Sequence, residues 1–255
     1  MKVFEIANII EKNFPLYLAE EWDNAGLLVG RADKDVNKVL VTLDVTDFVV
    51  DEAVRYNADM IVSHHPVIFS ALKSVTDKTG IGNRLIKLLQ NDIAVYSAHT
   101  NLDSAKGGIN EKLADLFSLN NTTPILSDEY GCGLGRIGTL SEPMSAFEFA
   151  ELAKSTLNTN VRISGDAARI VQCVAVGSGA CDDIIPKSLE MGADIVLTGD
   201  CKYHRNLDFV EMGAVIVDAG HYPTEIIAMS IFENVLKGNG FEIIKSEMKD
   251  IFTYV

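Results

Sequence analysis

The chain has 255 residues, of which 47% are hydrophobic and 23% are charged, as in ordinary globular proteins of one large or two small domains. The formal net charge is −14, from 22 basic and 36 acidic side chains, and a chain this acidic repels phosphate backbones, which argues against nucleic-acid binding. No run approaches the roughly 18 apolar residues of a membrane-spanning helix, so we expect no membrane partner.

The N-terminal segment MKVFEIANIIEKNF predicts an amphipathic helix of the folded protein rather than a signal peptide. Its charges are mixed, it lacks a small-residue cleavage site, and apolar residues recur at helical spacing: Val3, Ile6, Ile9, Ile10 and Phe14. The four cysteines form no CxxC pair, and we interpret them as small apolar core residues in a reduced, cytoplasmic setting: Cys132, Cys173, Cys181 and Cys201.

In the first half of the chain, β-branched apolar runs alternate with helical patterns. We expect strands at 38–45, 59–63 and 93–98, and helices at 46–56 and about 82–90 between them. This βαβαβ order is typical of an α/β fold with a mostly parallel or mixed sheet and helices on its faces.

The second half repeats the alternation. We expect a strand followed by a glycine turn at 171–179, and further strands at 194–198 and 214–219. Helices are expected at 182–191, 203–212 and about 223–237, and a closing strand in FEIIKSE. Residues 120–145 are rich in turn formers, so we interpret their glycines as an interdomain turn: Gly131, Gly133, Gly135 and Gly138. The predicted domains are 1–125 with 226–255, and 126–225.

The two halves also resemble each other in sequence. Residues 58–63 (ADMIVS) align with 193–198 (ADIVLT), followed by His-His in the first copy and Gly-Asp in the second. An internal duplication, giving two similar α/β domains related by a pseudo-twofold axis, explains this better than the general likeness of α/β strands.

The histidines all lie just beyond an expected strand or in the short element after it: His64, His65, His99, His204 and His221. Open α/β sheets bind ligands outside the carboxyl ends of their strands. Two of these loops also carry a carboxylate four residues after the histidine, at Asp103 and Glu225. The structural alternative is a set of polar loop residues, with Glu225 complementing a helix dipole.

Imidazole together with carboxylate suits Zn, Fe, Mn or Co better than Ca or Mg, which favour all-oxygen ligands. Three such clusters at one sheet edge predict a metal site. Two ions sharing about five protein ligands would keep open positions, which is typical of a catalytic rather than a structural site.

Two further turns have two interpretations each. The turn 177–179 (GSG) either cradles an anion with its amides or is a tight strand-to-helix turn, which we favour because two aspartates follow it. The segment 22–24 (WDN) either lines the site or has a structural role. We favour Trp22 as a packing anchor, with Asp23 and Asn24 as turn formers.

Five motifs, in order and spanning nearly the whole chain, resemble the Nif-three-like proteins, also labelled GTP cyclohydrolase I type 2 homologue or dinuclear metal-centre protein. They are WDNAGLLVG (22–30), SHHPVIF (63–69), SAHTNLD (97–103), GDCKYH (199–204) and GHYPTE (220–225). The chain resembles the short form, without the central inserted domain.

The resemblance implies two similar α/β domains with a metal site in the cleft between them, and a ring-shaped homohexamer. It assigns one divalent ion to His65 and Asp103 and the other to His64 and His221, with Glu225 contacting both. It also makes His99 and His204 candidates for proton transfer or for support of the metal ligands.

The function that follows is a metal-dependent hydrolase acting on a small molecule, in which a metal-bound hydroxide attacks a purine nucleotide ring, such as C8 of GTP, or a similar electrophile. One alternative is a phosphoesterase or other amidohydrolase using the same ions. Another is a metal-binding or scaffold protein without turnover that acts through partners.

Overall fold

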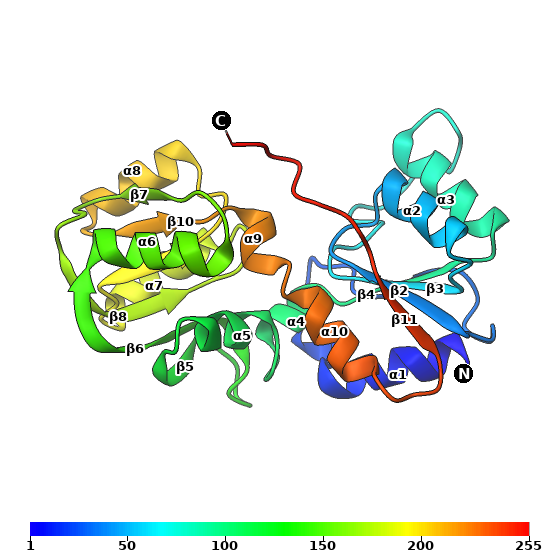
Figure 1. The fold of residues 1–255 in the computed structure, drawn as a ribbon, viewed down its shortest axis with the longest axis horizontal. Coiled ribbons are helices and arrows are strands. Elements are labelled where there is room, and N and C mark those ends of the chain that lie inside the picture. The colour runs from blue at the N-terminus through cyan, green and yellow to red at the C-terminus, as the bar shows by residue number, and fades with distance from the viewer. Residues whose placement is uncertain (255) are drawn as a thin grey trace. The chain divides into compact units, whose positions relative to one another are not determined.

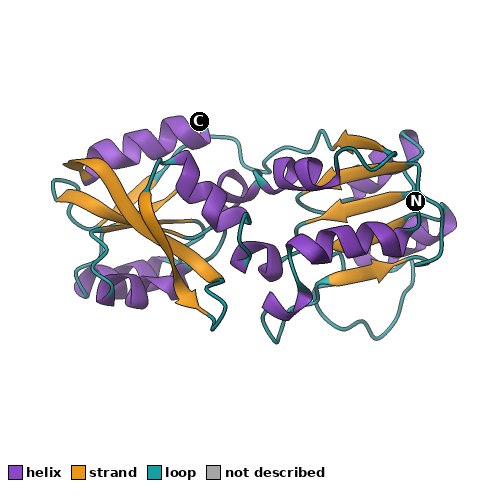
Figure 2. Cartoon of the chain, turned by 90° about the horizontal axis from the view of Figure 1, so that it is seen from below, coloured by secondary structure: helices purple, strands orange, loops and turns teal. Residues whose placement is uncertain are grey.

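The structure, a computed structural model, describes residues 1–254, which divide into two compact units. The first unit contains Met1–Ala105 and Ala228–Lys249, and the second contains Lys106–Ile227 with the described residues after Lys249. Each unit has its own sheet flanked by helices (Figures 1 and 2). The predicted class, two similar α/β units with mixed sheets, is confirmed.

The first unit has a five-stranded sheet in the order β1-β4-β3-β2-β11. Four of its strands are parallel: β2 (Lys38–Thr42), β3 (Met60–Ser63), β4 (Ala94–Ser97) and β11 (Glu242–Lys245). The edge strand β1 (Gly26–Val29) runs antiparallel beside β4. The carboxyl ends of β3 and β4 are therefore neighbours at one edge of this sheet.

Helices cover both faces of this sheet (Figure 1). One face carries α2 (Asp47–Arg55) and α3 (Gly80–Gln90), which enclose an apolar core with the strands. The other carries α1 (Val3–Asn13) and α10 (Ala228–Leu236), which pack against each other. The amphipathic N-terminal helix predicted from the sequence is thus present, with its apolar stripe buried.

The second unit has a six-stranded sheet in the order β5-β6-β8-β9-β10-β7. Its parallel strands are β8 (Ile170–Val176), β9 (Ile195–Thr198) and β10 (Ile216–Asp218). Antiparallel neighbours complete it: β5 (Asn120–Ser127), β6 (Gly133–Ser145) and β7 (Arg162–Ser164).

Two apolar cores, one on each face, hold the second sheet between helices. On one face lie α5 (Ile109–Leu116) and α6 (Ala146–Leu157), and on the other lie α7 (Ile185–Glu190) and α8 (Tyr203–Glu211). α6 begins with a capping box in which Ser145 and Glu148 each bond the other's backbone amide, and this satisfies amides that the first helical turn leaves open.

The two units share a common order of elements. β2-α2-β3-α3-β4 in the first corresponds to β8-α7-β9-α8-β10 in the second. β1 and β7 occupy the same place, each antiparallel to the last strand of its series. The likeness between the sequence halves therefore corresponds to a repeated supersecondary unit, and equivalent strand ends carry the polar loops of each copy.

Residues 120–145 differ from the expected interdomain turn, because they form the paired strands β5 and β6 within the second unit. The predicted division at 125/126 falls inside β5, and the contacts divide the chain after Ala105 instead. Gly131 lies in the turn between these strands, whereas Gly133 and Gly135 lie in β6 and allow close packing. A β-carbon on Gly133 would overlap the Leu126 carbonyl, and one on Gly135 would press on Ile125.

The long final helix expected at 223–237 is two helices, α9 (His221–Glu225) and α10. α9 is tied to the second unit, because Thr224 accepts a hydrogen bond from the Gly179 amide at 2.9 Å. α10 packs in the first unit against α1 and β2. The helical pattern is interrupted where the chain passes from one unit to the other.

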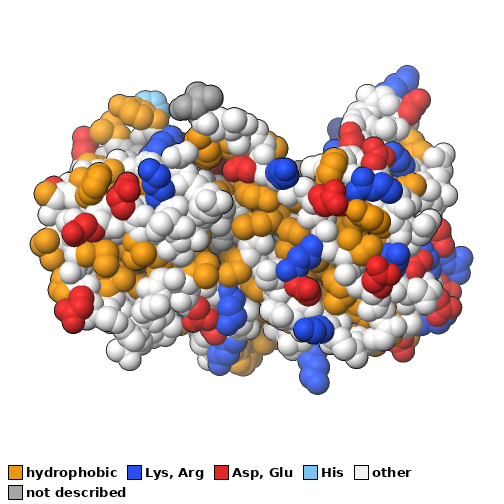
Figure 3. All heavy atoms as spheres, viewed as in Figure 1, with side chains coloured by type: hydrophobic (Ala, Val, Ile, Leu, Met, Phe, Trp, Pro, Cys, Tyr) orange, Lys and Arg blue, Asp and Glu red, His pale blue; other side chains and the backbone are white. Residues whose placement is uncertain are grey.

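On the face shown in Figure 3, acidic and basic side chains are interspersed with apolar ones over the surface of each unit. None of the helices within residues 1–254 is both long enough and apolar enough to cross a bilayer.

The two phenylalanines of α6 provide a matched test of the core that α5 and α6 form with the sheet of the second unit. Phe149 is fully buried and lies 5.5 Å from Phe117 between ring centroids, whereas Phe147 is 58% exposed. Phe149→Ala should lower the free energy of unfolding of this unit by about 3–5 kcal/mol. Phe147→Ala should change it by about 0.5 kcal/mol or less. Denaturant titration measures both, and equal losses would contradict the assigned helix face.

Candidate metal centre

The first candidate cluster lies at the carboxyl ends of β3 and β4. His64 and His65 directly follow β3, and their amides continue the hydrogen bonding to the chain at the end of β2, at 3.3 and 2.9 Å. His99 lies two residues beyond β4 and begins α4 (Thr100–Ser104). The parallel pairing of β3 with β4 is what brings residues distant in sequence together.

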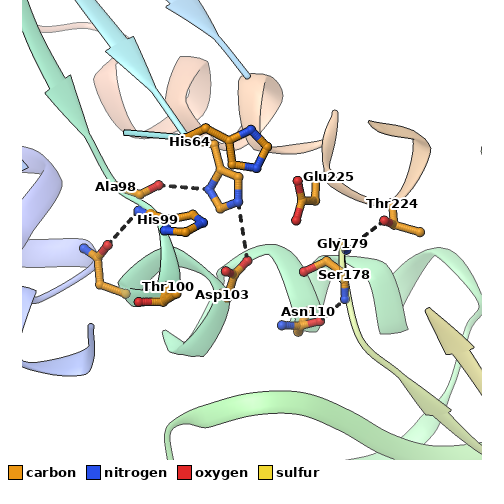
Figure 4. Close-up of polar contacts among 12 residues, drawn as sticks. His64, Ala98, His99, Thr100, Asp103, Asn110, Ser178, Gly179, Thr224 and Glu225 are labelled. Carbon is orange, nitrogen blue, oxygen red and sulfur yellow. Dashed lines mark hydrogen bonds and ion pairs between the residues drawn. The ribbon is translucent and has the colours of Figure 1, made fainter. Parts of the chain in front are cut away.

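These three histidines converge. Figure 4 shows two of them, His64 and His99. Their ring centroids lie 4.8 Å apart for His64 and His65, 5.1 Å for His64 and His99, and 5.5 Å for His65 and His99. Each offers one ring nitrogen within 4.8 Å of the others'. Three imidazoles this close are a donor set suited to zinc, iron and related metals.

Each of these rings is held through Nδ1 by an oxygen atom. The partners are the Ala98 carbonyl for His64 at 3.0 Å, the Asp44 carboxylate for His65 at 2.8 Å, and the Asp23 carboxylate for His99 at 2.8 Å. With Nδ1 donating to its oxygen, Nε2 is left as the nitrogen that can bind a metal ion or accept a proton. Oxygen partners of this kind fix the orientation of metal-binding histidines in many proteins.

Asp103 adds a carboxylate to the same cluster. It lies on α4 and is 8% exposed, and its Oδ1 is 3.8 Å from Nε2 of the fully buried His64 (Figure 4). One turn of helix therefore carries both His99 and Asp103, as their four-residue spacing predicts.

In the second unit, α9 supplies a histidine and a carboxylate. His221 Nδ1 lies 3.0 Å from Asp200, which follows β9, and His221 Nε2 lies 2.9 Å from Glu225 Oε2. Glu225 is 4% exposed. Gly179 approaches it so closely that a β-carbon there would overlap the Glu225 carboxylate.

The turn 177–179 next to α9 has no open amides for an anion. Its three amides donate to the Leu197 carbonyl at 2.9 Å, Asn110 Oδ1 at 2.8 Å and Thr224 Oγ1 at 2.9 Å. The prediction of a tight strand-to-helix turn, rather than an anion cradle, is confirmed. The turn supports α9 and with it the His221–Glu225 pair.

The donor chemistry fits a divalent metal ion. The Ala98 carbonyl can only accept, so neutral His64 has its hydrogen on Nδ1, and its Nε2 lone pair faces the Asp103 carboxylate. His221, with Asp200 at Nδ1, faces Glu225 in the same way. Two electron-rich atoms face each other favourably only through a cation, either a proton or a metal ion.

Asp23 is the most strongly held of the supporting carboxylates. Burial raises the pKa of Asp23, but hydrogen bonds from His99 and from the hydroxyl and amide of Thr100 outweigh it and lower the pKa to about 2. The carboxylate is therefore ionised at neutral pH and acts as an acceptor for His99.

The remaining sequence predictions have different outcomes. His204 lies exposed on α8, with its ring centroid 5.3 Å from that of Tyr203. It belongs neither to the three-histidine cluster nor to the His221–Glu225 pair, and its catalytic role stays a prediction. Trp22 is not a packing anchor, because it is 60% exposed. Its neighbour Asp23 is held by two side chains from the β4–α4 junction, which directs the segment toward the candidate site rather than the core.

Three carboxylates that hold candidate histidines were not assigned this role from the sequence: Asp23, Asp44 and Asp200. Asp23 was interpreted as a turn former, and the other two were not singled out. Each is hydrogen-bonded to a candidate histidine of its own unit that lies 21 or more positions away along the chain. For Asp44 and Asp200 the sequence did contain a signal, because both lie at or just beyond the end of an expected strand, where such folds place their sites.

The fold and donor sets define a two-unit α/β protein with candidate metal-binding residues. A sequence profile of the Duf34/NIF3 (NGG1p interacting factor 3) family matches residues 1–251. The chain therefore belongs to this family, as the motifs predicted.

Relatives match over the whole chain. The GTP cyclohydrolase 1 type 2 homolog of Clostridium perfringens is 37% identical over 265 residues, covering 100% of both chains. The solved Bacillus cereus protein related to NIF3 is similar with a TM-score of 0.92 at 27% identity, covering 100% of this chain and 99% of that chain. Reduced HcgD from Methanocaldococcus jannaschii has a TM-score of 0.85 at 36% identity, with 97% and 98% covered.

The lowered pKa of Asp23 predicts a pH dependence of stability for the metal-free protein. Its folded value of about 2 lies below the ordinary 3.8, so the ionised form stabilises the fold above pH 3.8, and this contribution is lost as the pH falls toward 2. Asp23→Asn lacks it at every pH. The difference in unfolding free energy between wild type and variant, measured by denaturant titration, should shrink across this range. A constant difference would contradict the stabilisation assigned to ionised Asp23.

Proposed function

We propose that this protein binds two divalent metal ions through His64, His65, Asp103, His221 and Glu225, and that it is a metal-dependent hydrolase. The observation that carries the proposal is the convergence of His64, His65 and His99 at the ends of β3 and β4. The His221–Glu225 pair supports the proposal, because His221 Nε2 and Glu225 Oε2, both atoms that can bind a metal ion, lie 2.9 Å apart.

The division of ligands between the ions follows the family resemblance. His65 and Asp103 would hold one ion, His64 and His221 the other, and Glu225 would contact both. Zn, Fe, Mn and Co all suit such a mixed nitrogen and oxygen set. When bound, the ions would supply Lewis-acid activation of water and of the scissile group.

His99 is the residue that we propose for proton transfer. Its Nδ1 is engaged by the ionised Asp23, which fixes the ring and favours protonation at the opposite nitrogen during a reaction. Its Nε2 is then available to take a proton from an attacking nucleophile or return one to a leaving group. Asp23 and His99 thus have the arrangement of an oriented general base. For His204, the proposed role is similar but rests on the motif GDCKYH alone.

The substrate class comes from the names of relatives. Several are called GTP cyclohydrolase 1 type 2 homolog, and we propose a purine nucleotide or a related small molecule as substrate. A phosphoesterase would use the same ligand set. A metal-binding or scaffold protein without turnover is the alternative from another class, and the oriented Asp23–His99 pair favours the enzyme over it.

Two further features of the proposal come from the resemblance. We propose that the chain assembles as a homohexamer, which light scattering coupled to size-exclusion chromatography measures. We also propose a cytoplasmic location, which fractionation of cells expressing the native protein tests.

The ligand assignment predicts a contrast among three neighbouring histidines. His64→Ala and His65→Ala should each lose bound metal and hydrolytic activity while the fold survives, because each removes a nitrogen ligand. His99→Ala should retain metal but lose turnover, because only proton transfer is removed. Elemental analysis after dialysis, circular dichroism, and a hydrolase panel that includes GTP measure the three properties.

His204→Ala, on the exposed face of α8, is the matched control for metal content and should retain both ions. Full metal retention in the His64 and His65 variants would refute the ligand assignment. Metal loss in His99→Ala would make His99 a ligand. Stoichiometric metal with no turnover of any nucleotide or ester by the wild type would favour the protein without enzymatic activity.

A further inference from the structure

Two large aromatic side chains lie exposed at the edge of the histidine cluster in the first unit. Trp22 is 60% exposed and Phe69 is 59% exposed, and their ring centroids are 5.9 Å apart. Both adjoin His99, at centroid distances of 6.0 Å from Trp22 and 6.1 Å from Phe69. We call these two rings the aromatic platform.

The segments that carry the platform are fixed by polar contacts. Asn24 Nδ2 donates to the Ile68 carbonyl at 2.6 Å, which ties the loop of Trp22 to the residue preceding Phe69. Asp23, whose side chain has no exposed surface, is held by His99 and Thr100. The rings therefore stand on a pre-organised frame, which lowers the entropy that a ligand must overcome on binding.

Neither ring is stacked face to face on the other or on His99. Trp22 and Phe69 are inclined to each other at 46°, so they do not stack face to face. They stand at 78° and 71° to the His99 imidazole. Aromatic rings that lie beside a catalytic candidate and are only partly covered are typical of surfaces that bind flat ligands.

We propose that the platform binds a planar nitrogen heterocycle of the substrate, such as a purine base, by stacking on Trp22 and Phe69. This inference rests on the proposed function, because it places the ring next to His99 and the other histidines. Stacking on aromatic side chains tolerates different bases, since every base has a π-face. The platform supplies affinity and position, while the neighbouring histidines supply the chemistry.

The platform also gives a role to two motifs. WDNAGLLVG provides Trp22 together with the residues that fix it, Asp23 and Asn24. SHHPVIF provides two metal-ligand candidates and, four residues after His65, Phe69. One loop thus carries both a candidate ligand and half of the platform.

Trp22 is the only tryptophan in the chain, so its fluorescence reports on the platform directly. We would titrate the 255-residue chain, with and without added zinc, with guanosine, GTP and ribose 5-phosphate. Guanosine and GTP should quench the fluorescence saturably, and ribose 5-phosphate, which lacks the ring, should not. The readout needs no turnover.

Variants separate the platform from general surface effects. Phe69→Ala should weaken guanosine binding about tenfold or more, while Phe69→Tyr, which keeps a ring, should bind nearly as the wild type does. Phe48, on α2 and 51% exposed, is the matched control, and Phe48→Ala should leave binding unchanged. Trp22→Ala should also weaken binding about tenfold, measured by equilibrium dialysis because the fluorophore is removed.

The outcomes distinguish this inference from the proposed function. Ring-dependent quenching in a protein that hydrolyses nothing supports the platform and refutes the hydrolase. Hydrolysis of substrates with and without a ring at equal KM refutes the platform alone. Equal quenching by ribose 5-phosphate, or no quenching by any of the ring compounds, overturns it. Trp22 emission that changes with protein concentration and not with ligand would show that a second copy covers the rings, and would also overturn it.

Discussion

The hydrogen bond between a histidine Nδ1 and a fixed oxygen atom recurs throughout the candidate metal centre. A backbone carbonyl holds His64, and carboxylates hold His65, His99 and His221. Each bond selects a tautomer and a ring orientation, so that the other nitrogen is presented to a ligand. Without these bonds the imidazoles would rotate, and a three-histidine cluster would have no defined donor geometry. The carboxylates also place negative charge behind the rings, which strengthens them as metal ligands.

The repeated α/β unit explains how these bonds arise twice. In each unit the polar loops follow the second and third strands of a parallel series, and parallel pairing sets the ends of those strands side by side. The first copy uses the positions after β3 for two histidines, whereas the second uses the equivalent position for Asp200, which supports His221. Thus the same position, after the second strand of the series, provides candidate ligands in the first copy and a supporting carboxylate in the second. The aromatic platform is an addition of the first copy, built from the segment before β1 and the loop after β3.

Much of this arrangement could be predicted from the sequence, because the relevant signals are local. β-branched runs predicted the strands β2, β3, β4, β8, β9 and β10, and the histidines could be assigned to strand ends from position alone. The pairing of Asp23 with His99, across 76 positions, has no local signal, since it depends on how two loops meet in the folded unit. The hairpin of β5 and β6 was missed because its glycines, which close contacts require, are also typical of turns. Trp22 was misjudged because a large apolar residue is more often buried than displayed.

Direct observation of the ring hydrogens would test the central claim. Nitrogen-15 NMR of the metal-free protein, labelled at histidine and recorded where the rings are neutral, distinguishes the two tautomers of each imidazole. The account predicts that His64, His65, His99 and His221 all carry the hydrogen on Nδ1, and that added zinc shifts the Nε2 resonances of His64, His65 and His221. Asp44→Asn and Asp200→Asn should disturb the resonances of His65 and His221 respectively. Nε2–H tautomers in the wild type, or Nε2 resonances of these three residues that zinc leaves unchanged, would contradict the account.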